Sequence, residues 1–266
     1  MAGTTINPYR FGGQVGYRRD GANRNYVRAR HLDTSRGRWI SRDPVSVAEA
    51  DFNLYCYVKN DPVTDIDPSG LWTIKSLSNG YWICKDRTDK AYVSSALDRT
   101  GVARMSICNA FNQCQCKGEC IATNGTLYDF GTGCPLGPVH DCKGNKTAGI
   151  AIEPHPIRIN VSNGQYITGR ALFVGKNCNL DDMPSAGAAV GRTAACIKQS
   201  GLCIFVTPAM TGRQLCALMR QQCSGGQSVN LDGSGSSQVA TSSNGACNKI
   251  VPGDARHDNN FIVLCR

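Results

Sequence analysis

The chain has 266 residues, of which 41% are hydrophobic, so it can bury a sizeable core and is not a disordered segment. No apolar stretch approaches the roughly 20 residues that a membrane-spanning helix needs, and the N-terminus has no apolar signal core. The formal net charge is +9, but the basic residues beyond Trp72 are scattered singly. This pattern argues against a contiguous basic stripe and against nucleic acid as a partner.

The first 71 residues predict short β-strands. Extended pieces such as R-N-Y-V-R-A-R-H-L and G-R-W-I-S-R are separated by turn residues. Strands of this kind standing alone would leave unpaired edges, so we expect them to belong to a larger repetitive β structure. The composition changes at D-P-S-G-L-W, residues 67 to 72. We therefore predict one domain over 1–71 and a second over 72–266.

Three stretches between Asn7 and Leu71 resemble the end of an Rhs/YD-repeat core: Y-R-F-G-G-Q, Y-V-R-A-R-H-L-D-T-S-R-G-R-W-I-S-R-D-P and N-L-Y-C-Y-V-K-N-D-P-V-T-D-I-D-P-S-G-L. In that family a β shell encloses a variable toxin and cuts itself free after D-P-x-G-L. The resemblance implies self-cleavage after Leu71 by the carboxylates of Asp43 and Asp67, which can act as acid and base on a peptide bond. Arg42 lies beside the first carboxylate. It also implies an upstream shell and an immunity protein as partners.

The first of these two Asp-Pro elements departs from the family pattern. It reads D-P-V-S and lacks the family's glycine. Asp-Pro pairs are also common turn formers, and this simpler interpretation stays open for both elements.

The cysteine content is high, with 15 in the chain. Cys56 stands alone in the first 71 residues, and the other fourteen follow Trp72. An even number spread through a domain predicts disulfides formed in an oxidising compartment, so we expect a secreted protein or one delivered to a target cell envelope. Three triplets that begin at Asn124, Asn145 and Asn160 match N-glycosylation acceptors, which matter only in a eukaryotic secretory route.

A zinc site is the main rival to disulfides. The run C-N-A-F-N-Q-C-Q-C-K-G-E-C places Cys108, Cys114, Cys116 and Cys120 within thirteen residues. Its C-x-C and C-x3-C spacings differ from paired zinc knuckles, and no histidine lies nearby. Disulfides are therefore favoured over zinc and over free buried thiols, and we expect neither a metal nor another cofactor.

The part of the chain after Trp72 predicts an α+β domain with a mixed β-sheet, flanking helices and many disulfides. A-L-F-V-G and L-C-I-F-V-T predict buried strands, and T-G-R-Q-L-C-A-L-M-R-Q-Q-C predicts an amphipathic helix. Thr211 and Gln214 match a capping box at the start of this helix. The segment S-V-N-L-D then completes a βαβ-type unit. Ligands favour the carboxyl ends of such strands, where Asp232 lies.

The order of G-R-T-A, a strand, M-T-G-R-Q-L-C-A-L-M-R and N-L-D-G-S-G-S-S resembles the phosphodiester glycosidase family. This is the family of the enzyme that removes N-acetylglucosamine from a phosphodiester-linked mannose. The resemblance covers about Val93 to Val263. R-T-G-V-A-R-M-S-I-C-N-A-F is similar to the family's N-A-G-F-F segment, which matches Asn109 to its asparagine, and A-R-H-D-N-N-F-I-V is similar to its closing strand.

Two features depart from the glycosidase pattern. Ser234 replaces the middle glycine of the family's G-G-G, which we expect to narrow the pocket. The segment around D-D-M-P-S-A-G is shorter than the family's G-G-P segment, which we expect to alter substrate access.

Cleavage of a sugar-1-phosphodiester requires a carboxylate, a positive donor for phosphate and a loop on which substrate can lie. Asp232 supplies the carboxylate, Arg192 can clamp phosphate through two N–H groups, and the serines can form an anion-binding nest. The expected catalytic residues are Asp232, Arg192, Asn109 and His257. The expected substrate-binding residues are Asn230, Gly233, Ser234, Gly235, Ser236, Ser237, Thr193 and Asn260. The second carboxylate stays open among Asp181, Asp182, Asp258 and Glu153.

The two resemblances together predict the C-terminal region of an Rhs-type polymorphic toxin. Its effector domain would hydrolyse a sugar-1-phosphodiester bond on target-cell glycans or envelope polymers. A non-catalytic glycan- or phosphate-binding module is the alternative that Ser234 keeps open. A toxin that attacks nucleic acid is less favoured, because the chain has neither a zinc-deaminase signature nor a His-rich nuclease motif.

Overall fold

The computed structural model describes residues 7–42, 53–68, 70, 74–77, 79–85, 89–96, 104–114, 116, 119–129, 132, 134–152, 155–199, 201–243, 246–251, 253 and 257–265. The chain divides into two compact units, Met1–Ser76 and Leu77–Arg266. Within the described ranges, no helix is long and apolar enough to cross a membrane.

The first unit contains the short strands that the sequence predicts. An antiparallel sheet is formed in chain order by β1 (Arg18–Arg19), β2 (Arg24–Val27), β3 (Arg30–Asp33) and β4 (Arg38–Trp39). A second pair joins β5 (Asp65–Ile66) to β6 (Ile74–Leu77), and 3-10 turns occupy Gly13–Val15 and Val58–Asn60. Alternate residues of the sheet are buried, among them Val27, Leu32 and Trp39. The core of this unit is therefore the inward face of one small sheet with the aromatic rings that cover it.

Asp67 and Gly70 of the D-P-S-G element are held inside the first unit. The Asp67 carboxylate lies 3.3 Å from the Arg30 guanidinium, and both side chains are almost fully buried. The Asp67 carbonyl accepts a 2.7 Å hydrogen bond from Tyr17, and the Gly70 N–H donates to the Asp67 carboxylate at 2.8 Å. Gly70 has φ +82°, and a Cβ there would collide with the Val27 carbonyl. Only glycine fits this turn without strain.

Two buried tyrosines make the first unit sensitive to alkali. The hydroxyls of Tyr17 and Tyr57 lie 3.0 Å apart. Burial raises the pKa of Tyr57 to about 12 and raises the pKa of Tyr17 further. Unfolded tyrosines lose their protons near pH 10, so the folded state binds more protons above that pH and its stability falls as pH rises.

We therefore expect the free energy of unfolding of this unit to fall between about pH 10 and 12. The expected slope is about 1.4 kcal/mol per pH unit for each tyrosine. Urea titrations followed by near-UV circular dichroism would measure it. Tyr57→Phe should flatten the slope, whereas Tyr9→Phe, at a 49% exposed position, should not. An equal slope in Tyr57→Phe and the parent would contradict the argument.

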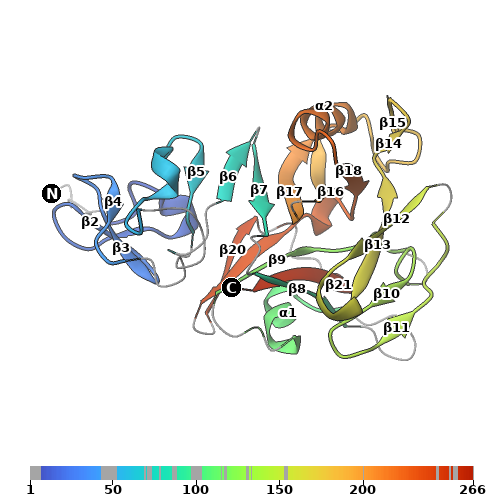
Figure 1. Ribbon diagram of the computed structural model, residues 1–266, viewed down its shortest axis with the longest axis horizontal. Helices are drawn as coiled ribbons and strands as arrows, with labels where there is room; N and C mark the ends of the chain where they lie inside the picture. The colour runs from blue at the N-terminus through green and yellow to red at the C-terminus, as the bar shows by residue number, and fades with distance from the viewer. Residues whose placement is uncertain are drawn as a thin grey trace, which may run out of the picture. The chain divides into compact units, whose positions relative to one another are not determined.

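The second unit is built on two antiparallel sheets (Figure 1). Sheet I has the order β11-β10-β13-β18-β16-β17-β7, with β12 also paired to β13; sheet II has the order β20-β19-β9-β21-β8. The strands of sheet I are β7 (Gly80–Cys84), β10 (Val139–His140), β11 (Lys146–Thr147), β12 (Pro156–Asn160), β13 (Tyr166–Ala171), β16 (Val190–Lys198), β17 (Gly201–Met210) and β18 (Gln227–Asn230). Those of sheet II are β8 (Lys90–Ser95), β9 (Cys120–Asn124), β19 (Val239–Ser243), β20 (Ala246–Val251) and β21 (Asn260–Cys265).

The described part of this unit contains two α-helices, α1 (Ile107–Gln113) and α2 (Gly212–Gln222). Leu215 and Met219 of α2 belong to one buried core cluster with Phe205 of sheet I, and Phe111 of α1 belongs to a second cluster with Phe261 of sheet II. Figure 1 shows the two helices on the two sheets. The predicted α+β class is thus confirmed in part, because the unit is mostly β with helices on its sheets. The predicted mixed sheet is wrong, because the neighbouring strands of both sheets pair antiparallel. Short 3-10 turns at Ser162–Gly164 and Ser234–Ser236 complete it.

The predicted strand-helix-strand unit is present. Strands β17 and β18 both pair antiparallel with β16, so they run parallel to each other on either side of it, with α2 as the crossover. The capping box of Thr211 and Gln214 is formed as predicted.

The predicted buried strand A-L-F-V-G is wrong. Ala171 ends β13, and Phe173–Val174 form a separate strand, β14, which pairs with β15 (Asn177–Cys178) across a turn at Gly175. Ala171 and Leu172 are buried, whereas Val174 is 40% exposed.

The predicted disulfide framework is present, and disulfides of this density are typical of an oxidising compartment. Five separate bonds join Cys84 to Cys203, Cys108 to Cys247, Cys114 to Cys142, Cys178 to Cys216 and Cys196 to Cys223. Two of them link positions 119 and 139 residues apart, which strongly restricts the unfolded chain. The remaining cysteines do not complete an even set: Cys56 and Cys134 are outside disulfides, and Cys116 is close to two partners.

Candidate active site

Asp232 lies just beyond the carboxyl end of β18 and ties sheet I to sheet II. Its N–H donates to the Gly125 carbonyl at 3.1 Å, and its carbonyl accepts a 2.7 Å hydrogen bond from the side chain of Asn124, at the end of β9. Its Oδ1 accepts from the Gly233 N–H at 2.9 Å. The residue is only 6% exposed. The carboxylate therefore has a backbone anchored from both sheets, which restricts its position.

Asn124 connects the groups around Asp232. Its Oδ1 accepts hydrogen bonds from the Thr193 hydroxyl at 2.8 Å and from the Gln238 N–H at 3.1 Å. The Thr193 hydroxyl also lies 3.3 Å from the Ser237 hydroxyl. Asn124 has no exposed surface, so the N-G-T triplet is part of a buried network and the glycosylation alternative is wrong at this position.

Tyr128 brings a phenol to the same site. Burial raises the pKa of Tyr128, and the charges of Asp232 and Asp258 raise it further. The Arg104 guanidinium lies over its ring, 4.7 Å from the centroid. Tyr128 thus keeps its proton at neutral pH and can donate a hydrogen bond beside two carboxylates.

Asp258 is the member of the four proposed second carboxylates that the structure brings near Tyr128. It is 2% exposed, its Oδ2 accepts from Gln238 Nε2 at 3.1 Å, and its backbone bridges Met105. Asp181 is exposed, and Asp182 lies with it in the segment between β15 and β16. Glu153 lies outside the described residues. Two buried carboxylates near one site are the usual equipment of a glycosidase.

The serine-rich loop packs closely against the start of β16. A Cβ at Gly191 would collide with the Ser234 carbonyl and lie 2.9 Å from the Ser237 Cβ. Ser236 and Ser237 are each 1% exposed, whereas the Ser234 side chain is exposed. Ser234 has φ +58°, so the substitution for the family's glycine falls at a left-handed position.

Ser234→Gly is expected to raise the free energy of unfolding by about 0.5–1 kcal/mol, because a left-handed backbone costs serine about that much more than glycine. Sugar release should not fall. Chemical denaturation would measure the first effect and a hydrolysis assay the second. Ser237→Gly is the matched control, since its φ is -64° and glycine brings no relief there. A destabilised Ser234→Gly would contradict the expectation.

The Arg192 side chain is engaged with backbone carbonyls. It donates to the carbonyls of Met210 (3.0 Å), Pro184 (2.8 Å), Ser185 (2.5 Å) and Ala188 (3.2 Å). Only 4% of the residue is exposed, and burial lowers its pKa. This arrangement holds the segment before β16 in place and differs from the phosphate clamp expected from sequence. Arg104, by contrast, is exposed, and its guanidinium lies over the Tyr128 ring.

The other predicted residues are divided between the site and its surroundings. Asn260 is buried at the start of β21. Its Oδ1 accepts a hydrogen bond from the Thr126 N–H at 2.9 Å, and its carbonyl accepts one from the Gly125 N–H at 3.1 Å. A Cβ at Gly125 would collide with the Asn260 Oδ1. Asn230 is buried in β18 and opposite Ala194. Asn109 is exposed on α1, and His257 is exposed beside Asp258. The structure therefore brings together Asp232, Thr193, Ser236, Ser237 and Asn260.

Sequence reasoning missed Asn124, Tyr128 and Gln238. The only signal for Asn124 was the buried strand pattern of C-I-A-T-N, which ends in an asparagine and a glycine. For the predicted self-cleavage residues, Arg42 is exposed and Asp67 is buried, while Asp43 and Leu71 lie outside the described residues.

A mostly β domain with two buried carboxylates beside a protonated tyrosine is suited to hydrolysis. The family model for phosphodiester glycosidases matches residues 111–265. The chain belongs to the phosphodiester glycosidase family, which confirms that resemblance.

Two solved structures are similar to this chain. One is the catalytic domain of zebrafish N-acetylglucosamine-1-phosphodiester alpha-N-acetylglucosaminidase, auto-inhibited by its pro-peptide, with 17% identity, 76% of this chain and 81% of that chain covered, and a TM-score of 0.50. The other is a hypothetical protein from Synechocystis, with 10% identity, 76% and 61% coverage, and a TM-score of 0.48. The first match supports the fold of the second unit.

Proposed function

We propose that residues 72–266 hydrolyse a sugar-1-phosphodiester bond on glycans or envelope polymers. The observation that carries this proposal is the placement of Asp232, anchored from both sheets, near a protonated Tyr128 and a second buried carboxylate, Asp258. Membership of the phosphodiester glycosidase family supports the same reaction.

In this mechanism the two carboxylates divide the acid and base work. Asp232, at the edge of the glycine- and serine-rich loop, acts on the anomeric centre, and Asp258 acts on water or the leaving oxygen. Tyr128 donates a hydrogen bond to an oxygen on which charge develops. Arg104 supplies the positive charge that a phosphodiester requires. Thr193 and Asn260 orient sugar hydroxyls.

The test is sugar release from a panel of sugar-1-phosphodiesters. Release by the parent protein and not by Asp232→Asn supports hydrolysis at this site. Saturable binding of the same compounds without turnover would favour the glycan- or phosphate-binding module. Strongly salt-dependent binding to DNA or RNA, with no sugar release, would favour the nucleic-acid alternative.

We also propose, from the sequence resemblance, that residues 1–71 are the end of an Rhs shell that releases residues 72–266 as a toxin into a target cell envelope. The burial of Asp67 with Arg30 and the close contacts of Gly70 are compatible with a segment built into the shell. Intact mass spectrometry tests this: a cut after Leu71 that Asp67→Asn abolishes supports it. An uncut parent chain co-expressed with its upstream shell would contradict it.

A further inference from the structure

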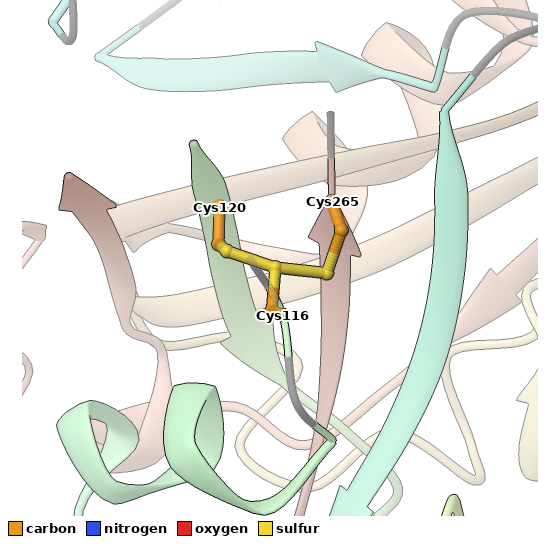
Figure 2. A group of neighbouring side chains, drawn as sticks. All are labelled: Cys116, Cys120 and Cys265. Atoms are coloured by element: carbon orange, nitrogen blue, oxygen red, sulfur yellow. A yellow bond between two sulfur atoms is a disulfide. The ribbon is translucent and has the colours of Figure 1, made fainter. Parts of the chain in front are cut away.

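Three cysteines meet at one edge of sheet II. Figure 2 shows Cys116 between Cys120 and Cys265, with its sulfur directed at both. All three sulfurs lie within 4.8 Å of one another. The Cα–Cα distances from Cys116 are 6.5 Å to Cys120 and 5.8 Å to Cys265, and both lie in the range of about 4.4–6.8 Å that a disulfide spans. A divalent sulfur forms only one disulfide at a time, so one of the two partners must remain a thiol.

The other described cysteines after Trp72 form disulfides elsewhere or lie outside this cluster. Ten of the fourteen cysteines after Trp72 form the five separate disulfides. Of the four that remain, three form this cluster and Cys134 is outside any disulfide and outside the cluster. Oxidation of the cluster therefore leaves one thiol next to one disulfide.

The positions of the three residues differ in a way that favours exchange. Cys120 begins β9 and Cys265 ends β21, and the two face each other in the register of neighbouring strands. They are 1% and 8% exposed. Cys116 lies outside regular structure between α1 and β9 and is half-buried. Two sulfurs are thus fixed by the sheet, and the third lies outside it, at Cα–Cα distances that allow a disulfide to either of them.

We propose that Cys116, Cys120 and Cys265 form an intramolecular thiol-disulfide exchange site. The Cys120 thiolate attacks the Cys116 sulfur, the Cys116–Cys120 bond forms and the Cys116–Cys265 bond breaks. Cys265 leaves as a thiolate and takes up the proton that Cys120 lost. The reverse step is identical in kind. Neither direction consumes an oxidant or a reductant, because one disulfide and one thiol are present on both sides.

The two pairings restrain the chain differently. A Cys116–Cys265 bond joins positions 149 residues apart and ties the last strand to the segment after α1. A Cys116–Cys120 bond joins positions only four residues apart and leaves β21 held by its hydrogen bonds and packing. The longer loop restricts the unfolded chain more, so it stabilises the folded state more. Exchange therefore changes how firmly the strand that carries Asn260 is secured.

Peptide mapping of the unreduced protein tests the proposal. The protein is quenched in acid, denatured, alkylated at low pH with N-ethylmaleimide to prevent reshuffling, and digested. We expect both Cys116–Cys120 and Cys116–Cys265 peptides, with alkylation divided between Cys265 and Cys120 accordingly. A single pairing, a Cys120–Cys265 bond, or a bond from this cluster to Cys134 would overturn it. Three unoxidised thiols with zinc bound in stoichiometric amount would also overturn it.

Two variants lock the site in each state and serve as matched controls. Cys120→Ser leaves only the Cys116–Cys265 pair, and Cys265→Ser leaves only the Cys116–Cys120 pair. We expect one pairing in each variant, and a higher melting temperature for Cys120→Ser under non-reducing conditions. The difference should disappear when the disulfides are reduced. Equal melting temperatures before reduction would contradict the proposed difference in restraint, and the mapping of the parent protein does not depend on whether either variant folds.

Discussion

Asp232→Asn is expected to lower kcat for sugar release by about 10² to 10⁴, the usual contribution of a positioned acid or base. The substitution keeps the size of the side chain and the oxygen that accepts from the Gly233 N–H, so the loop should stay in place. The backbone anchors to Asn124 and Gly125 do not involve the carboxylate. The melting temperature should therefore change little while turnover is lost.

The controls for this result are two other carboxylates. Asp181→Asn changes an exposed acid in the segment before β16 and should leave kcat unchanged. Asp258→Asn changes the second buried acid and should also lower kcat, with loss of one limb of the pH profile. Unchanged turnover in a folded Asp232→Asn protein would remove Asp232 from the mechanism.

Arg192→Lys is expected to destabilise the second unit by about 3 kcal/mol. The arginine fork reaches four backbone carbonyls, whereas an ammonium is a point donor that cannot reach all of them. In the variant, several of these buried carbonyls would lose the hydrogen bond that they accept from Arg192. Urea unfolding would measure the loss, and Arg213→Lys, at an exposed position on α2, should change stability by less than about 0.5 kcal/mol.

The same variant separates the two roles of Arg192. If the guanidinium supports the fold, stability falls and KM for the folded protein stays near that of the parent. If it clamps phosphate, KM rises severalfold with little change in stability. The second outcome would restore the role expected from sequence.

Local patterns in the sequence were enough to predict several elements and the centre of the candidate site. The Thr211–Gln214 capping box and the apolar spacing of Leu215 and Met219 depend only on residues within a few positions of each other, so α2 could be predicted. Asp232 could be predicted as the centre of the site for the same reason, because it ends a predicted strand directly before a run of glycines and serines. The high cysteine content likewise predicted disulfides, but not which cysteines pair with each other.

The tertiary structure decided everything that depends on residues far apart in the chain. Asn124 matches a glycosylation acceptor by its local sequence alone. Its partner Asp232 lies 108 positions away, so only the fold shows that Asn124 belongs to the site. Arg192 looked like a ligand clamp until the fold placed four carbonyls around it. The shared position of Cys116 between two partners depends on the register of β9 against β21. Spacing along a chain does not determine such meetings, since the same spacing is compatible with many ways of pairing strands.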